Sequence, residues 1–168
     1  MRTYVIAALL LAASGCSKSN FEGQVTHERV QAIARKIGVD NIRALTVKVT
    51  AKQVTVRAQN PKKPTKVQHW WFFKGKARGP RKVILLGGSL EASLWPLSSV
   101  DFTKVGSIVE RAEQMWGKKV RKMEVRIPKF ARWGNKLRWT VWFEGGSFTY
   151  ATPDGATVNP PMKRRRRK

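Results

Sequence analysis

The side chains that carry most protein chemistry are scarce in this chain, which has one cysteine, Cys16, and two histidines, His27 and His69. A zinc site needs three or four ligands at workable spacing, and no cluster of cysteines and histidines exists. A nucleophilic triad would need a histidine beside a serine or cysteine, and we expect His69 to pack among the aromatic residues of its strand instead. Residues 87–89 lack the lysine and the spacing of a phosphate-binding loop. We therefore expect no enzyme activity, no metal site and no cofactor.

The single thiol has a sequence context that predicts lipid attachment. Residues 13–16 read Ala13-Ser14-Gly15-Cys16. This segment resembles the lipobox of bacterial lipoproteins, in which leucine is more common at the first position. The resemblance implies cleavage before Cys16 and addition of fatty acyl chains such as palmitate to that cysteine. Two or more chains anchor a protein stably in a membrane. The alternative interpretation is an ordinary secretory signal followed by a spare thiol.

The first fifteen residues have the composition of an export signal. Arg2 is followed by an uncharged apolar run over residues 4–13 and then by small residues. The run is too short to cross a hydrocarbon core as a helix, which takes about 20 residues. We expect a signal peptide over residues 1–15 and a flexible tether over residues 16–23. Serine at position 17 indicates, by resemblance to Gram-negative lipoproteins, the periplasmic side of the outer membrane.

Positive charge dominates the composition, with 34 Lys and Arg against 10 Asp and Glu and a net charge of +24. Charge of this sign and size favours polyanions such as anionic lipid, phosphorylated glycolipid or nucleic acid. A row of like charges repels itself, so we expect a disordered tail over residues 159–168 that contacts a polyanion. The basic residues of this tail are Lys163, Arg164, Arg165, Arg166, Arg167 and Lys168.

Hydrophobic spacing predicts two helices, each followed by three strands. Apolar residues recur at helical spacing over residues 30–37 and 105–116. Thr26 and Asp101 are the expected N-caps, and Gly38 and Gly117 the expected stops. The predicted strands cover residues 42–49, 54–58 and 67–73 after the first helix and residues 120–127, 137–143 and 147–151 after the second. This pattern is typical of an α+β fold with antiparallel sheets.

The two halves of the chain repeat each other weakly but in register. Residues 42–49 align with residues 120–127 at an offset of 78, and the two helix stops are 79 apart. We therefore expect two tandem αβββ modules over residues 24–80 and 103–158, each an antiparallel sheet with a helix packed on one face. The intervening linker covers residues 81–102. An alternative alignment pairs residues 66–75 with residues 136–145 at an offset of 70.

This order of elements resembles the PepSY-like group, which is related in topology to the β-lactamase inhibitor proteins. The likeness covers residues 24–158 and includes the aromatic strand at residues 67–73. It also includes the closing segment Tyr150-Ala151-Thr152-Pro153-Asp154-Gly155. The resemblance implies binding or regulation of another protein, such as an exported peptidase, and no catalysis.

Strand alternation divides the side chains into a core face and an outward face. The expected core residues are Leu45, Val47, Val49, Val54, Val56, Met123, Val125, Ile127, Leu137, Trp139, Val141 and Phe143. The expected outward residues are Lys48, Thr55, Arg57, Lys122, Arg126, Arg138 and Trp142. Arginine forks match phosphate and carboxylate groups, and aromatic faces stack on rings. A second interpretation is that the outward aromatics pack between the two copies or under linker residues Leu90, Leu94, Trp95 and Leu97.

Together these features predict a lipid-anchored, non-enzymatic binding protein of the cell envelope. Its membrane contact is the lipid on Cys16, and its partners are an anionic lipid, a glycolipid or an acidic protein. The residues expected to hold the polyanion are Lys48, Arg57, Lys122, Arg126, Arg138 and Trp142, together with the basic residues of the tail. The alternative is a regulator or inhibitor of an exported protein, and nucleic-acid binding ranks third because export separates the chain from nucleic acid.

We predict that cells expressing the chain incorporate labelled palmitate into it and that Cys16→Ala abolishes the label, because the acylated sulfur is lost. Metabolic labelling followed by membrane fractionation measures this. Ser17→Ala is the matched control, since it leaves the thiol in place. A wild-type chain without label would contradict the anchor.

Overall fold

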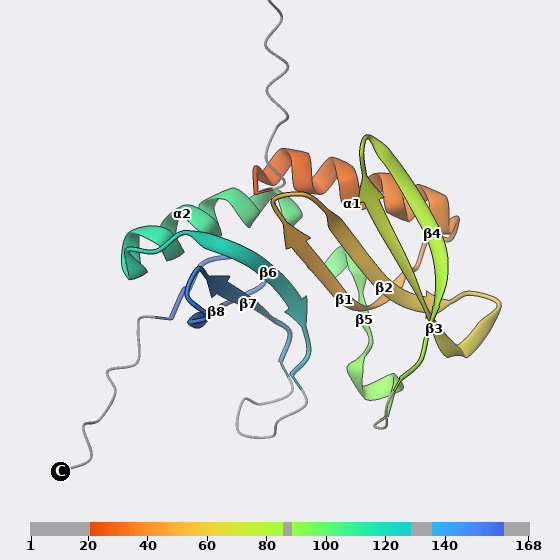
Figure 1. Cartoon of the computed structure of the whole chain (residues 1–168). Helices are drawn as coiled ribbons and strands as arrows, with labels where there is room; N and C mark the ends of the chain where they lie inside the picture. The colour runs from red at the N-terminus through yellow and green to blue at the C-terminus, as the bar shows by residue number, and fades with distance from the viewer. Residues whose placement is uncertain (1–20, 86–88, 129–135, 160–168) are drawn as a thin grey trace, which may run out of the picture.

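Helix α1 (Gly23–Ile37) and helix α2 (Val105–Trp116) lie on the same side of one antiparallel sheet (Figure 1). The computed structural model describes residues 21–85, 89–128 and 136–159. The sheet has eight strands in the order β4-β3-β2-β1-β6-β7-β8, and β5 pairs with β1. The α+β class and the antiparallel pairing are confirmed. We expected a sheet for each module, whereas the strands of both halves form a single sheet.

The strands follow the predicted positions except in the middle of the chain. Their bounds are β1 Arg43–Thr50, β2 Val54–Asn60, β3 Lys63–Phe73, β4 Lys76–Val83, β5 Trp95–Pro96, β6 Val120–Arg126, β7 Arg138–Phe143 and β8 Phe148–Ala151. Strand β4 was not predicted, and the expected boundary between the first module and the linker at residue 80 falls inside it. Its side chains are mostly basic, so they show no alternation of apolar and polar residues. The strand lies at the edge of the sheet and is held by backbone pairing with β3.

Both helices end where glycine allows the left-handed conformation. Gly38 has φ 76° and Gly117 has φ 60°, which confirms the two predicted stops. The predicted N-cap at Thr26 is wrong, because its amide already donates to the Glu22 carbonyl and its side chain is buried within the helix. Asp101 does cap, but it caps the short 3₁₀ turn η3 (Phe102–Lys104) that leads directly into α2.

One hydrophobic core serves both halves of the chain. Trp139 is fully buried, and the ring of Phe102 meets it edge-on at 6.1 Å between centroids. Trp116 of α2 stacks on Phe143 of β7 at 5.0 Å. The core joins residues of α1, α2 and strands from both halves, so the described residues fold as one unit around shared apolar surface.

The expected core face is correct apart from its first residue. A β-bulge between Ala44 and Thr46 changes the alternation at the start of β1. Ala44 is therefore fully buried and Leu45 only half-buried. Ile127 and Leu137 pack at the edge of the core, and the other predicted core residues are buried in it.

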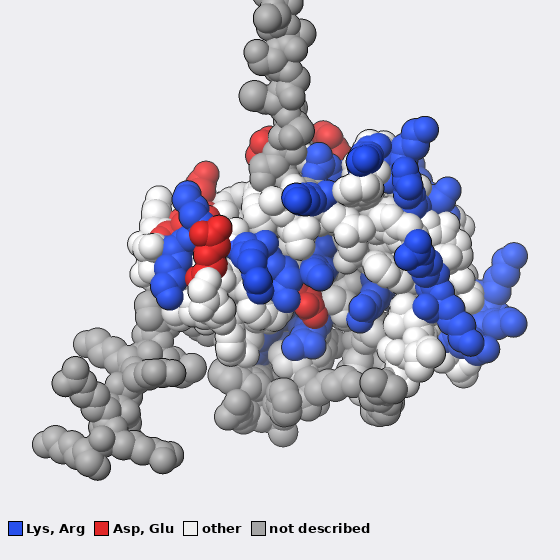
Figure 2. Space-filling view, viewed as in Figure 1, with Lys and Arg blue, Asp and Glu red and all other residues white. Residues whose placement is uncertain are grey.

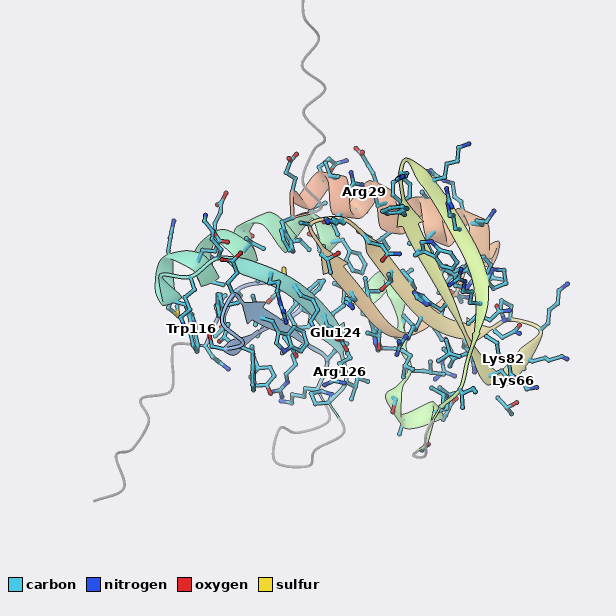
Figure 3. All side chains as sticks on the ribbon, viewed as in Figure 1. Arg29, Lys66, Lys82, Trp116, Glu124 and Arg126 are labelled. Atoms are coloured by element: carbon cyan, nitrogen blue, oxygen red, sulfur yellow. The ribbon has the colours of Figure 1, made fainter. Side chains whose placement is uncertain are left out.

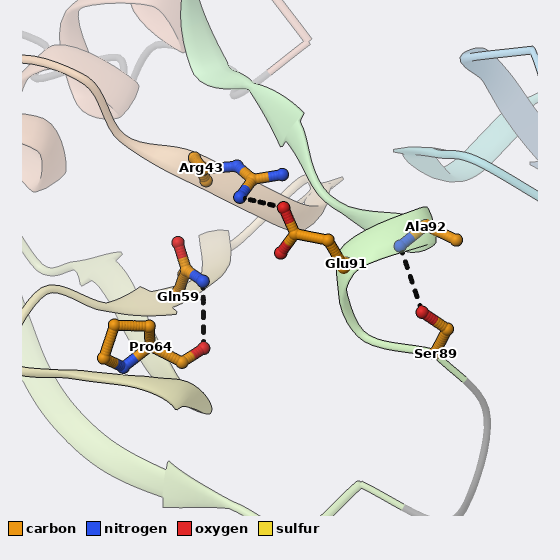
Figure 4. Close-up of polar contacts among 6 residues, drawn as sticks. All are labelled: Arg43, Gln59, Pro64, Ser89, Glu91 and Ala92. Atoms are coloured by element: carbon orange, nitrogen blue, oxygen red, sulfur yellow. Dashed lines mark hydrogen bonds and ion pairs between the residues drawn. The ribbon is translucent and has the colours of Figure 1, made fainter.

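The segment between β4 and α2 is fixed against strand β1. Trp95 and Leu97 are buried in the shared core, and the Trp95 indole donates to the carbonyl of Leu45 over 3.3 Å. Arg43 at the start of β1 forms an ion pair with Glu91 in the 3₁₀ turn η1 (Glu91–Ser93), as Figure 4 shows. The short turn η2 (Leu97–Ser99) follows β5 directly. Leu94, Trp95 and Leu97 are buried, whereas Leu90 is half-buried.

The turn after β8 packs against helix α2. The Arg111 guanidinium donates to the carbonyls of Gly155 and Ala156, at 2.7 and 2.8 Å. Gly155 has φ 71°, and a Cβ at this position would meet Cγ1 of Ile108 at 2.7 Å. The close approach of the turn to the buried side of α2 therefore depends on the absence of a side chain.

We predict that Gly155→Ala lowers the free energy of unfolding by more than Gly145→Ala does. Both glycines have positive φ, which costs an alanine about 1–2 kcal/mol, but Gly145 has open space where its Cβ would lie. Overpacking against Ile108 adds roughly 1–3 kcal/mol at Gly155. Urea titrations of both variants measure the difference, and equal losses would contradict the contact with α2.

Candidate functional site

The side of the sheet turned away from α1 and α2 carries the side chains that alternate with the core residues, and we call it the open face. Its register places Lys48 opposite Thr55 on one side and opposite Glu124 on the other. The open-face residues of the strands include Thr46, Lys48, Thr50, Thr55, Arg57, His69, Trp71, Phe73, Arg78, Arg81, Lys122, Glu124, Arg126, Arg138, Thr140, Trp142, Phe148 and Tyr150.

Positive charge on this face is almost uncompensated. Among all the described strands, Glu124 of β6 is the one acidic residue. Its carboxylate lies 3.6 Å from the guanidinium of Arg126 on the same strand. Figure 2 shows blue Lys and Arg atoms spread over the front of the sheet, and Figure 3 labels Glu124 and Arg126 on β6, with Arg29 on the helix side. The face as a whole is suited to an anionic partner.

Aromatic rings on the open face are covered by cations. The Lys122 ammonium lies 3.7 Å from the Trp142 ring centroid, and the Arg81 guanidinium lies 4.7 Å from the Trp71 ring centroid. Such contacts hold a flexible basic side chain in place while leaving part of its charge for another partner. Burial lowers the pKa of Lys122; the charges of Lys48, Arg121 and Arg126 add to this lowering, and Glu124 opposes it.

His69 lies in the middle of a basic row on β2, β3 and β4. Arg57 is its partner on β2, and Arg81 is its partner on β4. Burial is the main cause of a lowered His69 pKa, and the positive charges of Arg57, Arg81 and Lys48 lower it further. Among the described residues, nothing forms a hydrogen bond to the buried Nε2 atom of His69. The imidazole is thus a neutral group surrounded by cations.

The structure brings the predicted site residues of the sheet together on the open face. Lys122 lies opposite Trp142 across β6 and β7, and Arg126 lies opposite Arg138. Lys48 and Arg57 lie on the neighbouring strands β1 and β2. One interpretation of the outward aromatics was that they pack between two separate copies. This does not apply to Trp142, because both halves share one sheet and the Lys122 ammonium lies over the Trp142 ring.

Sequence reasoning missed the part of the face that β4 contributes. Arg78 lies opposite Trp71 and Arg81 opposite His69. The signal for this strand was the turn at Lys74 and Gly75, both of which have positive φ, between two segments able to pair as a hairpin. His69 packs against Trp71 of its own strand, as expected, with 5.5 Å between the ring centroids. Its basic neighbours Arg57 and Arg81 come from other strands and were not predicted.

Several predicted features lie outside the described residues. They are the signal peptide at 1–15, Cys16, the tether up to residue 20, and the tail residues Lys163, Arg164, Arg165, Arg166, Arg167 and Lys168. Over the described ranges, neither helix has the length and apolar content needed to cross a membrane. In the same ranges, no three His, Cys, Asp or Glu side chains are grouped in a way that could hold a metal ion.

A groove of about 810 Å³ lies on the helix side, between the end of α1 and residues 96–102. Its charged lining residues have both signs, with Arg35 and Arg43 against Asp40 and Asp101. This groove therefore lacks the uniform charge that distinguishes the open face.

Comparisons of the chain with protein-family models, with curated proteins and with solved structures give no match. The functional interpretation consequently depends on the residues of the open face. Their charge and their cation-covered aromatic rings indicate binding of an anion.

We predict that acidification destabilises the wild-type chain partly through His69. Its pKa is lowered in the folded state, so the unfolded chain takes up this proton first as pH falls below about 6.5, and stability is lost. Urea titrations at pH 7.5 and 5.5 should show a smaller loss for His69→Gln than for the wild type. His27→Gln on α1 is the matched control, and an unchanged pH dependence in His69→Gln would contradict the environment described.

Proposed function

We propose that this chain is a lipid-anchored, non-enzymatic binding protein of the cell envelope whose open face holds anionic groups of envelope components or of an acidic partner. The observation that carries the proposal is the composition of the open face, where Glu124 is the single carboxylate among the Lys and Arg residues. The lipobox-like segment ending at Cys16 supports a location at a membrane outside the cytoplasm.

The energetics of the open face favour a bound polyanion. Arg126 and Arg138 lie directly opposite each other on β6 and β7, and like charges at such positions destabilise a sheet by roughly 0.2–1 kcal/mol. Lys48, Arg57 and Arg81 add further positive charge on the adjacent strands. A polyanion lying across the strands removes this repulsion and makes charge-assisted hydrogen bonds with the arginine forks.

The basic tail fits the same partner. Outside the cytoplasm the abundant polyanions are lipid head groups, lipopolysaccharide phosphates and acidic polymers. Each basic residue near an anionic bilayer contributes about 1 kcal/mol within a Debye length. The six residues at 163–168 would therefore add to the attraction exerted by the open face.

We further propose that the two halves are copies of one αβββ unit. Two observations support this. The strand order β3-β2-β1-β6-β7-β8 is symmetric about the pair β1 and β6. In that pair Val47 lies opposite Val125, and these two residues are 78 apart, which is the offset of the sequence repeat. Equivalent residues face each other in an antiparallel pair only at a two-fold axis between the copies.

The other strands support this alignment over the alternative at offset 70. Val56 and Trp139 are the partners of Val47 and Val125 on the neighbouring strands, which makes β2 the counterpart of β7. The alternative would instead match β3 with β7. The offset grows beyond 78 after the first strand because the connection between β6 and β7 is longer than the turn between β1 and β2.

We predict that neutralising Lys122 and Arg126 together weakens binding of soluble polyphosphate, a phosphate polyanion that serves as the probe. The full chain is kept in non-ionic detergent, and affinity is measured by anisotropy of labelled polyphosphate over a range of salt concentrations. The slope of log affinity against log salt should fall by about 2 in the double Gln variant, since each phosphate contact contributes roughly 1.

The matched control is the double variant Arg35→Gln and Lys36→Gln, which removes the same charge from the last turn of α1. An equal loss in the control would mean that net charge alone binds the probe and would contradict the open face as the site. Deletion of residues 163–168 measures the contribution of the tail. Co-purification of one stoichiometric protein, unaffected by salt and by this deletion, would support the alternative function as a regulator.

A further inference from the structure

The basic cluster around His69 differs from the rest of the open face. His69 on β3 lies between Arg57 on β2 and Arg81 on β4, and Lys48 on β1 is near enough for its charge to act on the imidazole. Three neighbouring strands thus place Arg57, His69 and Arg81 side by side in one row, and Lys48 on β1 lies opposite Thr55 in the next row. The side chain of Arg81 is held over the ring of Trp71, whose centroid is 5.5 Å from that of His69.

In the described part of the chain, no carboxylate forms an ion pair with this cluster, although Glu124 of β6 lies directly opposite Lys48. Strands β1, β2, β3 and β4 contain no acidic residue. Among the described residues, neither Lys48 nor Arg57 nor Arg81 forms an ion pair with a carboxylate. The second half of the face differs in this respect, because Glu124 is paired with Arg126 there.

The buried Nε2 atom of His69 is an independent sign of a missing partner. A buried polar atom without a hydrogen bond costs free energy, and native proteins rarely retain one without a reason. The atom has no partner among the described residues, and the groups around it are positive. A negatively charged ligand oxygen would satisfy Nε2 once the side chains that cover this atom move aside, and it would also offset the positive charge around the ring.

The number and type of donors distinguish between anions. Two guanidinium forks, an ammonium and an imidazole N–H offer more hydrogen bonds than the two oxygens of a carboxylate accept well. A phosphate monoester has three terminal oxygens and carries between one and a half and two negative charges near pH 7, with a second pKa of about 6. It therefore matches the donor count and offsets more of the three positive charges than a carboxylate would.

We propose that Lys48, Arg57, His69 and Arg81 form a binding site for a phosphate monoester and that His69 takes up one proton from solvent when the dianion binds. The proton goes to the neutral imidazole, so that both ring nitrogens become donors and four positive charges surround the two negative charges of the dianion. This inference rests on the proposed function and deepens it, because it assigns one chemical group to one part of the open face.

The experiment follows the two histidines of the full chain by NMR, with ¹³C-labelled histidine and non-ionic detergent. Inorganic phosphate is titrated at pH 7 and constant ionic strength. We expect the His69 signal to move towards the protonated position while the His27 signal stays in place. In Arg57→Gln the apparent affinity for phosphate should fall by about tenfold or more, since a charge-assisted hydrogen bond is lost.

Arg35→Gln is the matched control, because it removes one arginine from the last turn of α1, away from the cluster and from the open face. Arg81→Gln is a second test variant; Arg81 and Arg57 are both exposed, so their loss should leave the core intact. Equal movement of both histidine signals, or the same shift with chloride, would overturn the site. If this happened while polyphosphate still bound, the proposed function would stand and this inference would fail.

Two sources of the phosphate group are separated by vesicle binding. Phosphatidic acid displays a phosphate monoester, whereas phosphatidylglycerol displays a diester, and the two are compared at matched surface charge. A preference for phosphatidic acid that Arg57→Gln removes would identify a lipid head group as the source. A response to inorganic phosphate without that preference would identify a soluble phosphate ester, and a response to neither would overturn the proposal.

Discussion

The antiparallel pairing of β1 with β6 is the interaction on which the rest of the structure depends. Val47 and Val125 face each other at its centre, both fully buried, so the two halves contribute to one core. The same pairing sets the other face. Because side chains alternate along a strand, burial of Val47 and Val125 turns Lys48 and Glu124 to the opposite side. A shift of one residue in the strand register would turn the charged side chains towards the core and the apolar side chains towards the open face. Packing of the core therefore determines which side chains lie on the open face.

This constraint explains why a folded chain tolerates so much positive charge on one surface. The core on the other face provides the stability, and the cations on the open face are partly held by aromatic rings, as Lys122 is by Trp142. Lys122 and Trp142 are also direct partners across β6 and β7. The remaining repulsion is a local cost that a bound anion would remove, so the charges that weaken the free protein would strengthen the proposed complex.

Much of this arrangement could be predicted from the sequence, because period-2 alternation in residues 47–49 and 139–143 indicates which apolar side chains form the core. The predicted outward residues Lys48, Arg57 and Arg126 all lie on the open face. The bulge at Ala44 could not be predicted, since either register buries an apolar residue there. Strand β4 could not be predicted, because backbone groups make its pairing with β3 and its side chains show no hydrophobic pattern.

The position of His69 shows why the site itself was harder to predict than the face. Its neighbours in sequence, Trp70 and Gln68, point to the core side, and its neighbours in space, Arg57 and Arg81, come from other strands. Only strand pairing reveals that Arg57 and Arg81 lie on either side of one imidazole. Glu124 on β6 lies opposite Lys48, but its carboxylate pairs with Arg126, and strands β1 to β4 contribute no acidic residue to offset Arg57 and Arg81. Positive charge is therefore distributed unevenly over the open face. A compact dianion would be stabilised best on β2, β3 and β4, which carry no acidic residue.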